Sequence, residues 1–469
     1  MTTSQVATMP PDAQPRPAGR VAGTAAPPPP LEAYRAGPRS APGPRRLTAQ
    51  ALVAVALVVL LGVLAAVAAV TVRADAEDLR TVVTGRAAVA ADLRFALADL
   101  DAQRADALAP GEAADDPDTV VGNELNALIT AQQRRAQVSD LLRRLGGDGS
   151  QSARVRALLD GLGRYDDLSG RSAFVSEQDP NRVAGHPPVV SVSMNVQAGA
   201  LMHDTLLPTA AALSAVYARQ ADAAHAHAHD TAVRWALVLG LLAAVTLLYL
   251  LWWQRALARA YRRLLNPPVL ATTAAVLAIA LAGLVALGAT ASAVDAASRE
   301  GLRPWSRLAE ARAVAAQAAA AESRWFVHES SLAVGDEQEF TELTRRLDTL
   351  LAPGGDADAR ERAAYRDVSA RYGHFRADDR RLRSLKDAGR TEEAVAVLTE
   401  VGRGDVAFDF WDFATTLDGL AARQLADFDA HARDASGSLA GWPGVPAGVL
   451  AAGALLVLAG IRPRLAEYR

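Results

Sequence analysis

The chain has 469 residues, of which 51% are apolar but only 5% aromatic, so Ala, Leu and Val supply most of the apolar surface. These residues suit helices and membrane spans better than β-sandwiches. There is no cysteine, which excludes disulfides and thiolate metal sites, and the net charge of −3 gives no sign of a nucleic-acid partner.

The N-terminal segment, residues 1–46, is rich in Pro, Ala, Gly and Arg and contains the run Pro27–Pro30. A segment of this composition cannot bury enough apolar surface to fold. We expect a disordered arm; the alternative is a docking site for a proline-recognising partner.

Four stretches of about a membrane thickness contain no charged residue. They are Leu47–Val72, Trp235–Trp253, Pro267–Val294 and Ser436–Ile461. Since a bilayer-spanning helix needs roughly 20 apolar residues, we expect a lipid bilayer around the chain. The expected transmembrane helices cover residues 47–72, 233–253, 268–292 and 439–461.

Arginines gather in the three segments that flank these spans on one side. By the positive-inside rule, such segments lie in the cytoplasm of a cell-membrane protein. Both termini are then cytoplasmic, and the long loops 73–232 and 293–438 lie outside. The arginines are Arg35, Arg39, Arg45 and Arg46 before the first span, Arg255, Arg259, Arg262 and Arg263 in the loop 254–267, and Arg462, Arg464 and Arg469 in the tail 462–469.

The first long loop shows the period of four amphipathic helices, because apolar residues recur at spacings of three and four. Turn chemistry separates them at Pro110–Gly111, Gly146–Gly149 and Asp179–Pro188. Pro208 lies inside the fourth helix and should kink it. Val189–Val196 is the one weak candidate for a strand. The apolar stripes of the first three helices begin at Val89, Leu125 and Val155, and the fourth helix is expected to run from near Val189 past Leu206.

The second long loop repeats this plan, with expected helices ending near Trp325 and Leu350 and others around Tyr365–Leu382 and Phe410–Phe428. An even number of up-and-down helices returns the chain to the membrane. The predicted fold is therefore all-α and integral to the membrane. It has four transmembrane helices and two extracellular up-and-down four-helix bundles, a duplicated span–bundle–span unit.

Four short segments resemble a known family: Ala96–Ala102, Leu206–Ala210, Leu308–Arg312 and Arg462–Arg469. They resemble an actinobacterial family of four-span membrane proteins typified by the partner of a glutamine-binding lipoprotein. The resemblance implies a relay of extracellular amino-acid availability to a soluble serine/threonine kinase, protein kinase G.

That family usually carries an Asn/Arg-rich turn before the fourth outer helix. This chain keeps Asn181 and Arg182 of it, followed by an altered Ala184–Pro188. We take these two residues as candidates for ligand or partner binding.

Other side chains are candidates for a binding site. Trp325, Phe326 and His328 suggest an aromatic wall for a small ligand, with a bundle core as the alternative, and we keep Trp325 and His328 as candidate ligand-binding residues. His225, His227 and His229 alternate with alanine at a spacing that can bind a metal, but without Cys or a nearby carboxylate we expect a solvated run and no metal or other cofactor. The acid pairs Asp115–Asp116 and Asp378–Asp379 are expected on the solvated surface.

No phosphate-binding glycine loop, hydrolase elbow or zinc-protease signature occurs, so nothing supports an enzyme. The spans also lack central ionisable residues, which ion pathways usually contain. We therefore expect a sensor that detects an amino acid or a solute-binding lipoprotein outside and recruits a cytoplasmic partner, such as a kinase, through the arginines of the loop 254–267. The alternatives are a non-sensing membrane scaffold or a transport accessory subunit; a homodimer also remains open.

Outer helices should run into the spans at Val72–Arg80, His229–Trp235, Val294–Leu302 and His431–Leu439. The Gly and Pro residues at 437–446 predict that the fourth junction is the weakest.

Overall fold

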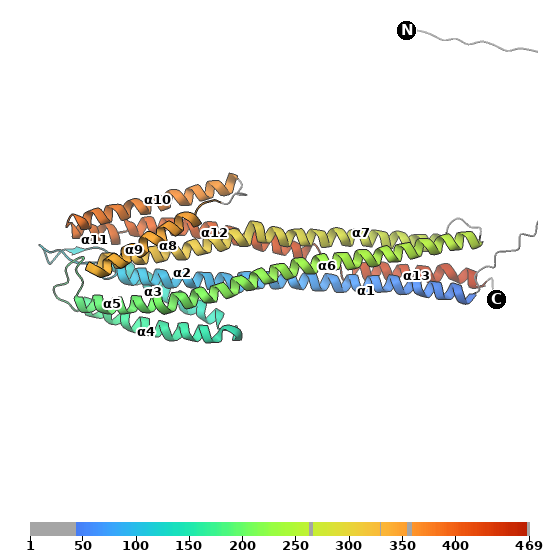
Figure 1. Cartoon of the computed structure of the whole chain (residues 1–469), viewed down its shortest axis with the longest axis horizontal. Coiled ribbons are helices and arrows are strands. Elements are labelled where there is room, and N and C mark those ends of the chain that lie inside the picture. The colour runs from blue at the N-terminus through green and yellow to red at the C-terminus, as the bar shows by residue number, and fades with distance from the viewer. Residues whose placement is uncertain (1–43, 262–265, 329, 354–358, 467–469) are drawn as a thin grey trace, which may run out of the picture.

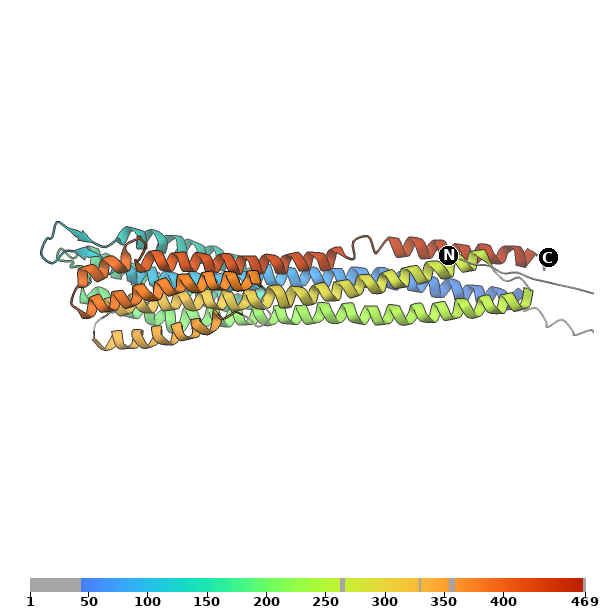
Figure 2. The ribbon, with the colours of Figure 1, turned by 90° about the horizontal axis from the view of Figure 1, so that it is seen from above.

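The computed structural model describes residues 44–261, 266–328, 330–353 and 359–466. In these ranges the protein is all-α, apart from one short hairpin and two isolated bridges. The predicted arm before residue 44, Arg262, Arg263 and the last three residues of the tail lie outside the described residues. The helices build one long rod (Figures 1 and 2).

Three helices are long and apolar enough to cross a membrane: Arg45–Asp106, Val189–Arg259 and Pro267–Val327. Their most apolar parts lie in α1 (Pro44–Val82), α6 (Leu207–Tyr261) and α7 (Pro267–Ala296). The fourth apolar helix, α13 (Val445–Ala466), has a shorter apolar part, Val445–Gly460. Within the described residues, the structure thus supplies three helices of spanning length where the sequence predicts four.

These four helices pack together at one end of the rod (Figures 1 and 2). Both α1 and α7 contact α6 and α13, which closes a four-sided bundle. Each of the four helices contributes fully buried side chains to its core, such as Val58, Leu250, Val276 and Val457. The outer faces of the bundle expose large apolar side chains such as Leu241.

The rest of the molecule, the distal region, begins with helices from the first long loop. They are α2 (Ala88–Asp106), α3 (Glu124–Leu145), α4 (Ser152–Glu177) and α5 (Val189–Leu201). A 3₁₀ turn at Gly149–Gln151 precedes α4, and the hairpin strands β1 (Gly111–Glu112) and β2 (Val120–Val121) precede α3. The turns fall where the sequence predicts them, and the fourth predicted helix begins at Val189 as α5, so the weak strand candidate at 189–196 is wrong.

The second long loop contributes α8 (Arg303–Val327), α9 (Ser330–Leu350), α10 (Ala359–Asp387), α11 (Thr391–Thr399) and α12 (Val406–Gly437). Four of these correspond to predicted helices. Helix α11 is not among the predicted helices, because its nine residues are too few to show a clear helical period.

The two halves of the distal region share one continuous hydrophobic core. Its centre is the contact between α2 and α8, which lie side by side. Alanines such as Ala316 and Ala320 on α8 are fully buried there, and small side chains let two helices approach closely. The prediction of two separate bundles did not foresee this shared core.

Three π-helical turns carry the outer helices into the apolar bundle without a break. They are η2 (Val83–Ala87), η4 (Met202–Leu206) and η5 (Ala297–Leu302). Pro208 and Pro304 follow η4 and η5 closely. Each proline lacks a backbone N–H and cannot make the usual helical hydrogen bond, and the π turn accommodates this missing bond. Pro208 therefore sits in a continuous helix with a bulge before it.

The fourth junction is different. Helix α12 ends at Gly437, Gly441 adopts φ +81°, and α13 begins at Val445. The predicted continuity through Leu439 is wrong, while the break that the Gly and Pro residues predict is present.

Candidate functional site

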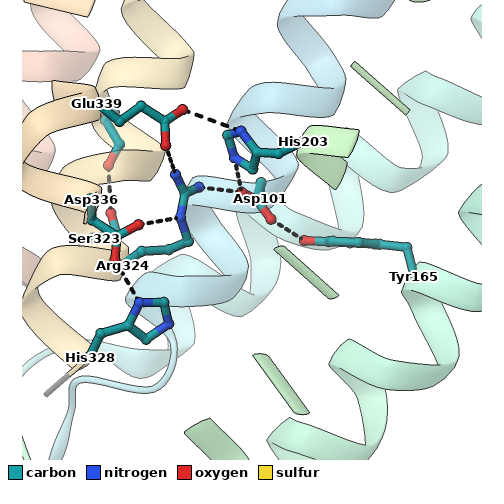
Figure 3. Close-up of polar contacts among 9 residues, drawn as sticks. Asp101, Tyr165, His203, Ser323, Arg324, His328, Asp336 and Glu339 are labelled. Atoms are coloured by element: carbon teal, nitrogen blue, oxygen red, sulfur yellow. Dashed lines mark hydrogen bonds and ion pairs between the residues drawn. The ribbon is translucent and has the colours of Figure 1, made fainter. Parts of the chain in front are cut away.

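An arginine is buried where the two halves of the distal region meet (Figure 3). Arg324 on α8 is 4% exposed. Its Nη1 lies 2.7 Å from Asp101 Oδ2 on α2, and its Nε lies 3.0 Å from Asp336 Oδ1 on α9. Its Nη2 lies 2.9 Å from Glu339 Oε2 on the same helix. One guanidinium therefore binds three carboxylates from both halves.

Further polar groups extend this contact (Figure 3). The Tyr165 hydroxyl donates to Asp101 Oδ1 at 3.0 Å. His203 lies between Glu339, 3.2 Å from its Nδ1, and Asp101, 3.6 Å from its Nε2. His328 Nδ1 is 2.6 Å from Asp336 Oδ2. We call these residues the ionic cluster: Asp101, Tyr165, His203, Arg324, His328, Asp336 and Glu339.

The electrostatics of the cluster follow from its composition. Burial alone would raise the pKa of Asp101, but the neighbouring His203 and the charge of Arg324 hold it below its ordinary value. Burial and the Asp101 charge raise the pKa of the Tyr165 hydroxyl. Burial opposes the charge on Arg324, yet its carboxylate partners raise the Arg324 pKa above its usual range. Three carboxylates therefore face one arginine and two histidines in the cluster.

The cluster residues lie on the helices that lead to the apolar bundle. Asp101 is on α2, which continues α1 through η2, and Arg324 is on α8, which continues α7 through η5. His203 lies on η4 itself, which opens α6. A rearrangement of the cluster would therefore act on three helices that enter the bundle without a break.

The residues kept from the Asn/Arg-rich turn have separate roles. Asn181 is exposed, and its backbone N–H donates to Asp179 Oδ1 at 3.0 Å. Arg182 is half-buried; its Nη1 donates to Glu124 Oε2 and its Nη2 to the Ala107 carbonyl, both at 2.9 Å. Arg182 thus ties the turn to α2 and α3.

The predicted aromatic wall is covered by cations of α10. The guanidinium of Arg383 lies 4.2 Å from the centre of the Trp325 ring, and Lys386 Nζ lies 4.3 Å from it. Lys386 also donates to the Trp325 carbonyl at 2.8 Å. Trp325 is therefore packed beneath two cations, and its neighbour His328 belongs to the ionic cluster.

The arginines of the predicted output loop are described only in part. Arg255 and Arg259 are exposed near the end of α6, whereas Arg262 and Arg263 lie outside the described residues.

One surface prediction is wrong. Asp378 and Asp379 are 8% and 3% exposed, because they share the inner side of α10 with Phe375 and Leu382. Asp379 accepts from Arg383 Nε at 2.6 Å. Asp115 and Asp116 are exposed, as predicted.

Two of the three histidines, His225 and His227, lie near carboxylates that are distant in the sequence. His225 Nε2 is 3.8 Å from Asp295, and His227 Nε2 is 3.5 Å from Asp75. Among the described residues, no group of three or more side chains could hold a metal ion.

Sequence reasoning missed Asp101 and Arg324. The available signal was a charge inside an otherwise apolar helical segment: Asp99 and Asp101 interrupt an Ala/Leu stripe, and Glu322 and Arg324 follow the alanines of 313–321. Such charges are rarely buried unless they are paired. Their partners come from distant segments and are visible only in the folded chain.

Comparison with known proteins adds no relative: no protein-family model, no curated protein and no solved structure matches this chain.

Proposed function

We propose that the protein is a four-span membrane sensor. Its distal region, outside the cell, detects a cue and passes it through the spans to a soluble cytoplasmic partner such as a serine/threonine kinase. The cue is an amino acid or a solute-binding lipoprotein. The observation that carries this proposal is the ionic cluster, whose Asp101, His203 and Arg324 lie on three helices that run unbroken into the apolar bundle.

Four spans are supported by the packing of the apolar bundle. The closed arrangement of α1, α6, α7 and α13 needs all four helices. The 16 residues Val445–Gly460 would measure about 24 Å at 1.5 Å per residue, which is short of a hydrocarbon core of roughly 30 Å. The turn at 438–444 and its Trp442, which packs against Gly283, would complete the crossing.

The cluster suits a switch because its interactions are strong and depend on one another. A buried charge that loses its partner costs about 3–5 kcal/mol, so partial breakage is unfavourable and the cluster should have a few discrete arrangements. A cue that binds one arrangement more tightly shifts the population by that difference in affinity. The exposed Arg255 and Arg259 at the end of α6 would present the result to the partner.

The experiment measures coupling between the cluster and the far end of the bundle. The chain contains no cysteine, so spin labels can be placed at Ala49→Cys and Ala271→Cys, exposed positions near the starts of α1 and α7. In full-length protein in nanodiscs, His203→Gln should change the distance distribution between the labels. His431→Gln removes a histidine that pairs with Glu300 outside the cluster and should leave the distribution unchanged.

Identical distributions in all three proteins would refute the coupling and favour a non-sensing scaffold. Circular dichroism of each variant separates a shift between arrangements from a loss of helix.

A further inference from the structure

A cavity of about 520 Å³ opens between the two halves of the distal region. Side chains of α2 and α3 form one wall, and side chains of α8, α11 and α12 form the other. No residue of the ionic cluster lines it. Its volume falls within the range of roughly 300–1,000 Å³ that is usual for small-molecule sites.

The arginines of the cavity are already paired. Arg134 donates to Asp99, and Arg312 binds Asp92 and Asp418, each at 2.9 Å. Both guanidiniums also stack on the Phe95 ring, 5.0 and 4.8 Å from its centre. The positive charge in the walls is therefore satisfied by protein groups.

The inner wall holds two acids that each have one buried oxygen without a hydrogen-bond partner. Glu322 on α8 is 1% exposed, and its Oε1 has no hydrogen-bond partner. Asp106 at the end of α2 likewise has a buried Oδ1 without a partner. A buried carboxylate oxygen without a donor is costly, so these two atoms point to a group that the protein itself does not provide.

The raised pKa values of Asp106 and Glu322 agree with the lack of a donor for these oxygens. Burial raises the pKa of Asp106 to about 7, opposed by the Ser323 hydroxyl and assisted by the charge of Asp99. Burial, with the charges of Asp379 and Asp106, raises the pKa of Glu322 well above its usual value, while Arg383 opposes the shift. A cationic donor that entered the cavity would stabilise the ionised form of both acids, which would then release the protons that they otherwise retain.

The remaining walls suit a compact organic molecule. Phe408, Phe410 and Trp411 supply aromatic surface, and Trp411 is 59% exposed at the mouth. Amide side chains such as Gln103 and Asn126 face the cavity from α2 and α3. Aromatic faces attract organic cations, which matches the unpaired acids deeper in the site.

We propose that this cavity binds a small organic cation with a primary ammonium or guanidinium group, which Asp106 and Glu322 receive. Its role as the cue rests on the proposed sensor function, whereas the binding itself does not. Because the site lies between the halves, an occupied cavity holds α2 and α8 at a fixed separation. These are the helices that the ionic cluster also joins.

The test uses isothermal titration calorimetry on full-length protein in phosphatidylcholine nanodiscs, whose zwitterionic lipid limits nonspecific cation binding. Agmatine should bind saturably, and glutarate, an anion of similar size, should not. Asp106 and Glu322 give up protons on binding, so the measured enthalpy should depend on the ionisation enthalpy of the buffer.

Glu322→Gln and Asp106→Asn should each weaken agmatine binding by about tenfold or more, the loss expected for a charged hydrogen bond. Glu322→Gln should also raise the melting temperature, since it removes a buried carboxyl that has one oxygen without a partner and lies beside Asp379, so weaker binding is not a sign of misfolding. Asp378→Asn is the matched control, because Asp378 on α10 is also a buried acid whose pKa is raised to about 7, but it does not line the cavity.

Absence of saturable agmatine binding, equal binding of glutarate, or undiminished binding to both cavity variants would overturn the cation site. Agmatine binding without any change in the distance between labels at positions 49 and 271 would leave the site standing and count against its role as the cue. A distance change in His203→Gln without agmatine binding would leave the sensor proposal standing and refute the cation site.

Discussion

At Arg324, a single buried guanidinium binds Asp101, Asp336 and the partly exposed Glu339. We expect Arg324→Met to destabilise the protein by about 3–5 kcal/mol, because Asp101 and Asp336 lose their cationic partner while buried. Arg345→Met is the control: Arg345 pairs with Glu342 on the solvated face of α9, and its loss should have no measurable effect. Thermal unfolding followed by circular dichroism makes the comparison, and equal melting temperatures would show that the cluster does not hold the halves together.

Asp378 gives a prediction about pH. Burial and the hydrogen bond and charge of Asp409 raise its pKa from 3.8 to about 7. The folded protein therefore binds more protons than the unfolded chain between these values. This contribution to stability is complete below about pH 4 and is lost as the pH rises through about 7.

Asp378→Asn removes this titration. Between pH 5 and pH 8, the wild type should lose about 1 kcal/mol more stability than the variant, an amount reduced by solvent screening. Asp115→Asn, at an exposed position, should follow the wild type. Parallel melting curves of wild type and Asp378→Asn across this pH range would contradict the prediction.

At the scale of elements, η5 packs closely on α12 at the base of the distal region, at Gly301. A Cβ built on Gly301 would lie 2.5 Å from Phe428 Cβ and 2.6 Å from its backbone N. Since the obstacle is backbone, α12 as a whole would have to move. We expect Gly301→Ala to destabilise the protein by about 2 kcal/mol.

The matched control is Gly373→Ala in α10, where nothing lies within 4 Å of the added Cβ. That substitution should stabilise the helix by about 0.5–1 kcal/mol, because alanine loses less conformational entropy on folding. If both alanine variants melted at the same temperature, the packing of η5 on α12 would not be as tight as described.

For the whole molecule, the Arg distribution predicts that the distal region lies outside the cell and the end of α6 inside. In intact cells, Ser150→Cys should react with a membrane-impermeant maleimide, and Arg259→Cys should react only after permeabilisation. Both positions are exposed, and the chain has no cysteine of its own. Labelling of Arg259→Cys but not of Ser150→Cys in intact cells would reverse the topology.

The shared core also joins the two halves of the distal region along their length. Contacts between the halves run from Arg80–Asp429 near the apolar bundle to the Ala114 N–H that donates to Glu392 at the distal tip. Glu392 lies on α11, the helix that sequence reasoning missed. Any cue that binds between the halves therefore acts on the whole distal region.

The sequence by itself determined the elements that depend on local chemistry. Apolar runs placed α1, α6 and α7, a period of three to four residues placed the distal helices, and Pro and Gly placed the turns and the break before α13. These signals are readable because each arises from neighbours a few residues apart. The exposure of Asp115 was predictable for the same reason.

Only the tertiary structure decided which helices meet and which charges are buried. The periods of α2 and α8 show an apolar face on each but not that the two faces pack on one another. Arg324 reads as an ordinary surface arginine until Asp101, 223 positions away in sequence, is placed beside it. The unpaired oxygens of Asp106 and Glu322 and the cavity between the halves arise in the same way. Whether a charge is paired depends on partners brought together by folding, and a single sequence shows only the periodic face on which that charge lies.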